Sequence, residues 1–401
     1  MRAAPPLHFL EPAASAAWAP FHGVRPVAEL RAGAWPVRER WTRLLEAAPA
    51  AIVGDALAGF HEFDEPPIQP TGPIAGPAIV VRSDFAPALA EPAPLAAGVR
   101  RLVHSGTTVA WVVPAGETWQ GPEEPGPAGG GGADAAREVA GLLLRGAFDL
   151  VTALERLLAD DVAQLARDGG DPLPAGSVVL GDAALVVARG ALIEPGVVFD
   201  VRKGAIVLEA NVEVRAGARL EGPLYAGRGT RLLGGPIANA VFGPRCNARG
   251  EISTSVFTGY CNKGHDGFVG HSVLGHWVNL GAGTTTSNLK NTYGEVRLDV
   301  GRERLATGRT NLGTLFGDHA KTAIGTMLAT GTVVGAGANL FGAAGVPKWV
   351  PPMAWGNELR ERLTEDGFLK IATRVLPRRD VEVTDARRAS LAAIYRRATA
   401  G

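Results

Sequence analysis

An aliphatic or small residue returns at every sixth position in four series between residues 174 and 346. The series are Leu208, Val214, Leu220, Ala226 and Leu232; Val187, Ile193 and Phe199; Phe268, Leu274 and Leu280; and, with one polar exception at Asp318, Leu312, Asp318, Ile324, Thr330 and Ala336. An α-helix repeats every 3.6 residues and cannot give this spacing, whereas a hexapeptide period is typical of a parallel β-helix. We therefore expect a prism of short strands over residues 174–350, with the repeated residues facing one shared core.

The hexapeptide pattern is interrupted at residues 284–311, a stretch too long to be a turn. We expect it to leave the prism as a loop or hairpin and to return, and loops on a rigid scaffold often carry function. The C-terminal part, residues 356–401, has a helical pattern instead. Its expected helices are residues 357–376 and 384–398, the last one capped by Thr384 or Asp385.

The first part of the chain, residues 1–168, mixes strand and helix patterns, which indicates an α/β domain. A low-complexity loop, GPEEPGPAGGGGADAA, occupies residues 121–136. The expected strands are residues 52–57, 78–86 and 101–113, and the expected helices are residues 38–48 and 138–166.

The composition limits the classes of protein to be considered. The 401 residues include 40 basic and 40 acidic side chains, a balance that argues against a general nucleic-acid binder, which needs a basic surface. Cys246 and Cys261 are the only cysteines, which indicates a reducing compartment. No run of about 18 apolar residues and no signal-peptide pattern appear. We therefore expect a cytoplasmic protein that neither crosses a membrane nor binds nucleic acid.

Two stretches resemble a known family of transferases. Residues 263–288, KGHDGFVGHSVLGHWVNLGAGTTTSN, are similar to the acetyltransferase segment of the bacterial bifunctional N-acetylglucosamine-1-phosphate uridylyltransferase/glucosamine-1-phosphate acetyltransferase. Residues 25–33, RPVAELRAG, resemble an N-terminal run of a divergent bacterial branch of sugar nucleotidyltransferases. The resemblance implies an α/β nucleotidyltransferase-like domain at residues 1–168, then a left-handed parallel β-helix at residues 174–350 with a C-terminal helical tail.

The resemblance implies that His265 is the general base of acyl transfer. Its imidazole would take a proton from a sugar ammonium, so that the free amine attacks an acetyl thioester. Asn279 matches a residue that holds the sugar and orients the base. Asn288 matches another sugar contact.

The sequence also departs from the family pattern. Two family tyrosines are replaced by Phe268 and Leu289, and the lysine that binds the sugar phosphate falls on Ser253. Thr326 and Ala344 fall on positions that touch coenzyme A in the family, so acetyl-coenzyme A is the expected cosubstrate. The residues expected to replace the missing phosphate-binding charge are Lys263, Arg245 or Arg249.

The resemblance further implies that the first domain joins a nucleoside triphosphate to a sugar 1-phosphate. Arg25 is one candidate residue, and Asp84 matches the position that holds Mg²⁺. The family has a glycine-rich phosphate loop near its N-terminus, but no glycine precedes Gly23 here, so we expect a degenerate domain. The alternatives are that Asp84 caps a helix and that Arg25, Glu29 and Arg31 form a structural ion-pair cluster.

The leading hypothesis is an enzyme of nucleotide-sugar biosynthesis, similar to UDP-N-acetylglucosamine formation. It would transfer an acetyl or other acyl group to an amino sugar phosphate, with nucleotidyl transfer in the first domain. The resemblance implies a homotrimer with sites between subunits.

Two other classes stay open. One is a non-catalytic trimeric scaffold. The other is a zinc hydratase like the β-helical carbonic anhydrases, because His271 and His276 are five residues apart. That class needs a third histidine from the upstream part of the prism, and residues 174–264 contain none.

Overall fold

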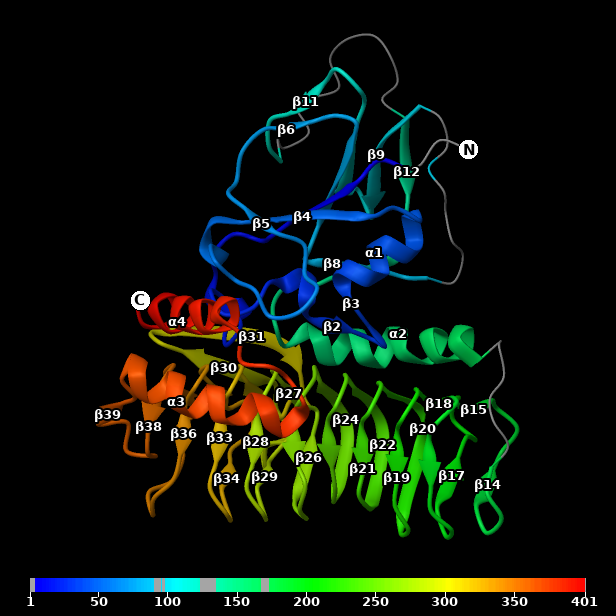
Figure 1. The fold of residues 1–401 in the computed structure, drawn as a ribbon, viewed down its shortest axis with the longest axis vertical. Helices are drawn as coiled ribbons and strands as arrows, with labels where there is room; N and C mark the ends of the chain where they lie inside the picture. The colour runs from blue at the N-terminus through cyan, green and yellow to red at the C-terminus, as the bar shows by residue number, and fades with distance from the viewer. Residues whose placement is uncertain (1–3, 90–94, 96–97, 123–134, 167–172, 401) are drawn as a thin grey trace. The chain divides into compact units, whose positions relative to one another are not determined.

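The computed structural model describes residues 4–89, 95, 98–122, 135–166 and 173–400. The chain forms two compact units (Figure 1). The first comprises Met1–Ala13, Pro26–Leu30 and Trp35–Leu144, and the second comprises Ala14–Arg25, Arg31–Ala34 and Arg145–Gly401. Among the described residues, no helix is both long and apolar enough to cross a bilayer.

The first unit has a mixed sheet of seven strands in the order β12, β9, β10, β7, β1, β4, β5. Strands β7, β1, β4 and β5 run parallel, whereas β10 is antiparallel to β7 and β9. Helix α1 (Val37–Leu45) completes the expected α/β architecture, which is confirmed. The strands are β1 (Leu7–Leu10), β4 (Pro49–Val53), β5 (Ile68–Gln69), β7 (Ala78–Arg82), β9 (Val99–His104), β10 (Thr107–Val113) and β12 (Ala135–Glu138), with the smaller pairs β6 (Ile74–Ala75)–β11 (Thr118–Trp119) and β8 (Phe85–Pro87)–β13 (Gly141–Leu143).

Several expected elements of this part differ in the structure. The expected strands 78–86 and 101–113 are each two strands, interrupted at Ser83–Asp84 and at Ser105–Gly106. The helix expected over residues 138–166 begins only at Asp149, because the preceding residues pair as β12 and β13. Most of the low-complexity stretch, residues 123–134, lies outside the described residues.

The second unit contains a parallel β-helix, as the hexapeptide period predicts. One sheet holds twelve strands and a second holds ten, and a third face carries the pair β29–β34. Strands β20, β22 and β24 are long enough to bend around a corner; β20, for example, pairs with both β17 and β18. The first sheet contains β14 (Val178–Leu180), β15 (Leu185–Val187), β17 (Val198–Asp200), β18 (Ile206–Leu208), β20 (Ala218–Ala226), β22 (Gly235–Phe242), β24 (Glu251–Phe257), β26 (Phe268–Gly270), β27 (Val273–Leu274), β32 (Leu315–Phe316), β35 (Val333–Val334) and β37 (Trp349–Val350).

The second sheet of the prism carries Lys263, Asn279 and Lys321. Its order is β16 (Leu192–Ile193), β19 (Glu213–Val214), β21 (Arg231–Leu232), β23 (Asn247–Ala248), β25 (Asn262–Lys263), β28 (Asn279–Leu280), β33 (Lys321–Thr322), β36 (Asn339–Leu340), β38 (Ala354–Trp355) and β39 (Glu361–Arg362). All neighbours run parallel except β38 and β39. The two-residue strands alternate, so one residue faces the core and the other faces outward.

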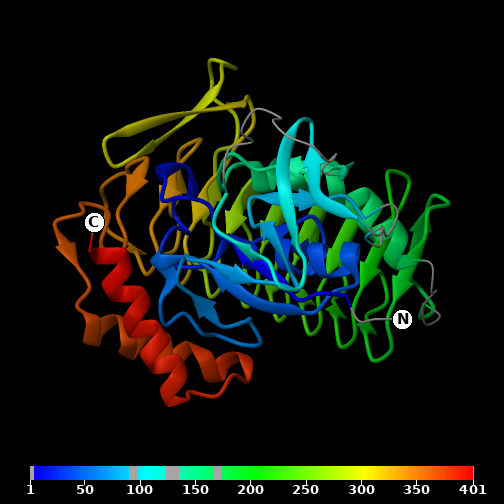
Figure 2. The ribbon, with the colours of Figure 1, turned by 90° about the horizontal axis from the view of Figure 1, so that it is seen from above.

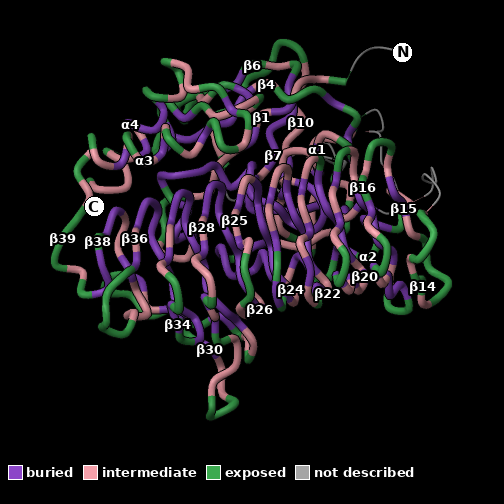
Figure 3. The backbone as a smooth tube through the Cα atoms, turned by 60° about the horizontal axis from the view of Figure 1, so that its bottom comes forward, coloured by how far each residue is buried: buried purple, intermediate pink, exposed green. Residues whose placement is uncertain are grey.

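The core of the prism is a column of aliphatic and aromatic side chains. Figure 3 shows the buried positions, in purple, recurring along the strands of the prism. The expected inward series from Leu208 to Leu232 is buried throughout. The fourth series is wrong in phase, because Ile324 is 82 % exposed. In that part of the prism the inward positions are Phe316, Thr322, Leu328, Val334 and Leu340.

The insertion at residues 284–311 first continues the prism as β29 (Thr285–Thr286), which pairs with β34 (Met327–Leu328). It then leaves as the antiparallel hairpin of β30 (Val296–Val300) and β31 (Glu303–Arg309), as expected. Figure 2 shows this yellow hairpin projecting away from the prism strands.

Helices cover parts of the prism. Helix α2 (Asp149–Leu165) packs on β20, β22 and β24. At the C-terminus, α3 (Glu365–Val375), the 3-10 helix η5 (Leu376–Arg379) and α4 (Asp385–Thr399) follow one another. The helix expected at residues 357–376 thus starts later than predicted, at Glu365. Thr384 caps α4 through the main-chain N–H of Arg387, as one of the two expected caps.

Candidate functional site

The first candidate site lies at the carboxyl edge of the parallel strands of the first unit. Strand β1 has β4 on one side and β7 on the other. Between β4 and β7 the chain therefore crosses from one side of β1 to the other. In open α/β sheets, ligands bind at such a switch point, beyond the carboxyl ends of the strands. The residues that follow these strand ends are Glu11, Gly54 and Ser83–Asp84.

Glu11 holds the segment that carries the RPVAELRAG motif. Its carboxylate accepts hydrogen bonds from the main-chain N–H groups of Val27 (2.7 Å) and Ala28 (3.1 Å). Desolvation raises the pKa of Glu11 to about 7, although the two amide hydrogen bonds act in the opposite direction. An acidic side chain thus occupies backbone donors at this edge, where the related family has a glycine-rich phosphate loop.

Asp84 lies at the same edge but is already paired. Its two carboxylate oxygens contact Nε (2.8 Å) and a terminal nitrogen (2.7 Å) of Arg82. Both oxygens of Asp84 are thus engaged by the guanidinium of Arg82. Among the described residues, no three His, Cys, Asp or Glu side chains are grouped to hold a metal. The Mg²⁺-binding role of Asp84 stays a prediction, and we assign no step to the metal.

Arg25 belongs to the second unit. Its guanidinium forms a buried ion pair with Asp318, at 2.9 Å from both Nε and a terminal nitrogen. Arg31, in the same unit, donates to the main-chain carbonyl of Thr258 (3.2 Å). These contacts give Arg25 a structural role within the unit that carries the prism. Its predicted part in nucleotidyl transfer is untested.

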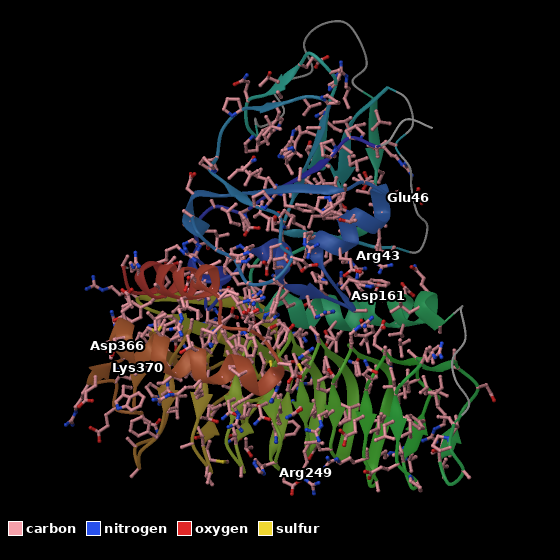
Figure 4. All side chains as sticks on the ribbon, in the orientation of Figure 1. Arg43, Glu46, Asp161, Arg249, Asp366 and Lys370 are labelled. Carbon is pink, nitrogen blue, oxygen red and sulfur yellow. The ribbon has the colours of Figure 1, made fainter. Side chains whose placement is uncertain are left out.

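The second candidate site surrounds His265, which lies exposed at a corner of the prism. The preceding Lys263 faces the interior, and its ammonium donates to the main-chain carbonyls of Arg249 (3.1 Å) and His265. The following Asp266 pairs with the side chain of Arg249 at 3.1 Å; Figure 4 labels Arg249 at the rim of the prism. The main-chain carbonyl of His265 is therefore held by Lys263, while its exposed imidazole reaches solvent.

The burial of Lys263 bears on its predicted contact with substrate. The residue is 1 % exposed, and burial lowers its pKa to about 8. Its ammonium serves main-chain carbonyls of the corner. The predicted substrate contact of Lys263 stays a prediction.

Asn279 belongs to a column of outward-facing amides on the second sheet. Asn247 donates to Asn262 (3.1 Å), and Asn262 donates to Asn279 (2.8 Å) across three successive strands. The next strand places Lys321 beside Asn279. This column lines a cavity of about 340 Å³, whose lining does not include His265. The remaining lining residues are Tyr260, Trp277, Val278, Val375, Arg378 and Arg379.

Arg245 lies at the neighbouring corner and contacts the C-terminal segment. Its guanidinium donates to the main-chain carbonyl of Arg379 and pairs with Asp380 (2.9 Å). Arg245, Tyr260, Trp277 and His319 all have positive φ values between 55° and 64°. Such backbone is uncommon for bulky residues and often marks a functional region. The predicted substrate contact of Arg245 is untested.

Asn288 is paired with His271 rather than with His265. The side-chain amide of Asn288 lies 2.8 Å from Nδ1 of His271, and burial lowers the pKa of that imidazole. His276 contacts the ring of Tyr260 instead, with centroids 5.6 Å apart. The two histidines of the zinc hypothesis thus have separate surroundings.

Thr326 and Ala344, the expected coenzyme A contacts, have local partners. The hydroxyl of Thr326 donates to the carbonyl of Ala323 (2.8 Å), and the carbonyl of Ala344 accepts from the side chain of Asn357 (2.8 Å). Both predictions are untested.

Known proteins support the resemblance for part of the chain. Residues 8–169 match the sugar nucleotidyl transferase family model. The chain is also 33 % identical over 146 residues to a bifunctional sugar-1-phosphate nucleotidylyltransferase/acetyltransferase from Sulfurisphaera tokodaii. The aligned part covers 35 % of this chain and 36 % of that protein, about a third of each. The predicted similarity to sugar nucleotidyltransferases is therefore confirmed.

Sequence reasoning missed several residues of these sites. Glu11 directly follows a strand pattern, and a search for acids at strand ends would have found it. Lys321 occupies the same column as Asn279, but the insertion at residues 284–311 separates the two in sequence. No sequence signal places Arg378 and Arg379 against this column.

Proposed function

We propose that the chain is a transferase of nucleotide-sugar biosynthesis whose prism transfers an acyl group from acetyl-coenzyme A to an amino sugar phosphate. The observation that carries this proposal is the geometry of His265, an exposed imidazole on a corner whose main-chain carbonyl accepts from the ammonium of Lys263 and whose neighbour Asp266 pairs with Arg249. The relative from Sulfurisphaera tokodaii, named as an acetyltransferase as well as a nucleotidylyltransferase, supports the reaction class.

In the proposed reaction, neutral His265 removes a proton from the sugar ammonium. The free amine attacks the thioester carbonyl, a carbon–nitrogen bond forms, and the carbon–sulfur bond breaks. The imidazolium returns its proton to the leaving thiolate of coenzyme A, so the base is regenerated, and the second proton that the nitrogen loses as the amide forms passes to solvent. A fixed main chain at residue 265 limits the motion of the imidazole and so favours the geometry of proton transfer. The homotrimer implied by the resemblance is part of this proposal.

Thiol release from acetyl-coenzyme A, with glucosamine 1-phosphate as acceptor, tests the proposal. The substitution His265→Ala should lower kcat by about 10²–10⁴-fold, the usual contribution of a general base. His61→Ala, which removes an exposed histidine of the first unit, is the matched control and should leave kcat unchanged. Full turnover by the His265→Ala protein would contradict the assignment of the base. Absence of turnover by the wild type would favour the scaffold alternative.

Nucleotidyl transfer in the first unit is the second candidate function, because residues 8–169 match the sugar nucleotidyl transferase family. Its test is pyrophosphate release from uridine triphosphate and a sugar 1-phosphate. If Asp84 takes part, Asp84→Asn should abolish the release. An unchanged rate in that variant would exclude Asp84 from the reaction.

A further inference from the structure

Cys246 and Cys261 lie opposite one another on two successive turns of the prism. They directly precede β23 and β25, in which Asn247 pairs with Asn262. The main-chain N–H of Asn247 also donates to the carbonyl of Cys261 (2.8 Å). Neighbouring strands are about 4.8 Å apart, and the Cα atoms of a disulfide are usually about 4.4–6.8 Å apart. The register of the prism therefore gives these two residues a separation that a disulfide can bridge.

Both side chains belong to the core of the prism, where each residue is 0 % exposed. Both thiols are free, and they lie within hydrogen-bonding reach of one another. The thiol of Cys261 also donates to the main-chain carbonyl of Gly275 (3.1 Å), and the thiol of Cys246 donates to that of Pro244 (3.8 Å). The surrounding backbone thus keeps the two sulfur atoms beside each other.

The two thiols differ in their surroundings. Desolvation acts to raise the pKa of Cys246, but the hydrogen bond with Cys261 and the charges of Arg31 and Arg379 outweigh it, so the pKa lies below its usual value. Burial raises the pKa of the Cys261 thiol. The thiolate is the reactive form of cysteine, and nearby cationic side chains favour it. This difference points to Cys246 as the nucleophile of the pair and to Cys261 as the thiol that reacts second.

We propose that Cys246 and Cys261 form a redox-modification site, which hydrogen peroxide converts into a disulfide between two turns of the prism. The sulfur of Cys246 attacks one peroxide oxygen, the oxygen–oxygen bond breaks, and the other oxygen leaves as water with the proton of the Cys246 thiol. The sulfur of Cys261 then attacks the resulting sulfenic acid. A sulfur–sulfur bond forms, the sulfur–oxygen bond breaks, and the oxygen leaves as water with the proton of the Cys261 thiol. The two thiols lose two electrons, and the peroxide gains them.

The alternative is that the two cysteines only fill space, because free cysteine packs as a small apolar residue. Neither sulfur is exposed, so peroxide reaches the pair through local opening of the prism corner, and a molecule as small as hydrogen peroxide needs little of it. The site lies apart from His265 and does not rest on the proposed acyl transfer.

The chain allows a direct test, because Cys246 and Cys261 are its only cysteines. The folded full-length protein is treated with hydrogen peroxide, denatured with a thiol-blocking reagent and digested with trypsin without reduction. Trypsin cleaves between the two cysteines and places them in the separate peptides 246–249 and 250–263. We expect these peptides to be joined, with a mass two hydrogen atoms below the sum of the free peptides. Dithiothreitol should release both, because a disulfide is reversible and the higher oxidation states are not.

Two variants test which sulfur reacts first. Cys261→Ala leaves Cys246 without its partner, so the sulfenic acid should accumulate and be trapped by dimedone. Cys246→Ala is the matched control and should give at least about tenfold less dimedone adduct, because the remaining thiol carries less thiolate. An equal yield from the two variants would overturn the assignment of Cys246 as the nucleophile.

The wild type alone decides whether the disulfide belongs to the folded chain, so the test does not depend on the folding of either variant. Two free thiols after peroxide treatment would overturn the proposal and leave the pair with a packing role. A cross-link that forms only in urea, or one that joins two chains on a non-reducing gel, would overturn it as well.

Discussion

The folded chain favours the protonated form of the Glu11 carboxyl group. Desolvation raises its pKa from 4.5 to about 7, so the folded chain holds this proton more tightly than the unfolded chain does. The contribution of Glu11 to stability is therefore largest at low pH and falls as the pH rises from about 4.5 to about 7.

Glu11→Gln should remove this pH dependence while keeping one of the two oxygens that now accept from Val27 and Ala28. The effect in the wild type is at most about 3 kcal/mol between pH 4.5 and 7. Urea unfolding at a series of pH values measures it as the difference between the two proteins. A constant difference from pH 4.5 to 7.5 would show that the pKa of Glu11 is ordinary.

Lys263 is a second charged residue with an unusual pKa, inside the prism. Burial lowers its pKa from 10.5 to about 8, so the unfolded chain holds the proton more tightly. The stability of the wild type should therefore rise as the pH increases from about 8 to about 10.5, by at most about 3 kcal/mol from this group.

Lys263→Met should remove this rise, because methionine fills a similar volume without a charge. The comparison with Lys321→Met separates the two lysines, since the pKa of Lys321 is also about 8. The measurement is the free energy of unfolding of each protein at pH 7.5 and pH 10. If Lys263→Met keeps the full pH dependence of the wild type, the ammonium of Lys263 is solvated.

At the residue scale, the sequence predicted the residues that a motif carries and missed those that only the fold brings together. His265 and Asn279 were predicted from one continuous stretch. Glu11, Lys321 and Arg379 come from three separate regions, and their importance depends on strand ends, on register and on the position of η5. No local sequence pattern predicts the strand ends, the register or the position of η5.

Among the elements, the strands of the prism were predictable because each turn repeats the same spacing. The exact phase was not, since the turns differ in length: Val198 pairs with Arg219, whereas Ile237 pairs with Ile252. After the hairpin of β30 and β31, the pattern resumes with a different residue facing the core. The early part of the expected helix 138–166 failed for another reason: its residues pair with β8 and β9, and tertiary pairing overrides a helical period.

The phase of the prism after the hairpin can be tested with two substitutions. Leu328 is 3 % exposed and belongs to the core, whereas Ile324 is 82 % exposed. Leu328→Ala should cost about 2–5 kcal/mol of stability, the usual cost of removing a buried leucine, while Ile324→Ala should change stability by less than about 0.5 kcal/mol. Chemical denaturation of both variants gives the comparison. Similar losses in the two would contradict the observed phase.

The two compact units do not follow the order of the chain, because segments from the N-terminal region belong to the second unit. The second unit takes in Ala14–Arg25 and Arg31–Ala34, which lie far from the prism along the chain. Arg25 and Asp318 join one of these segments to the prism through an ion pair whose side chains are each 2 % exposed. A buried pair of this kind is costly to break, because removing one partner leaves the other charge buried and alone. No local pattern predicts this pairing across 293 positions.

A chain that begins at residue 145 lacks both segments and so leaves Asp318 without Arg25. In the full chain, Asp318→Asn should destabilise by about 3–5 kcal/mol, because it removes the carboxylate of a buried ion pair with Arg25. In the shortened chain the same substitution should be neutral or stabilising, since it removes a lone buried charge. Asparagine keeps an oxygen for the main-chain N–H of His276, which now donates to Asp318 at 3.0 Å. Thermal and denaturant unfolding of the four proteins measure this reversal of sign.

Leu328→Ala, made in both backgrounds, is the control and should destabilise both alike. An equal loss from Asp318→Asn in the two backgrounds would mean that Arg25 contributes little to the stability of the prism.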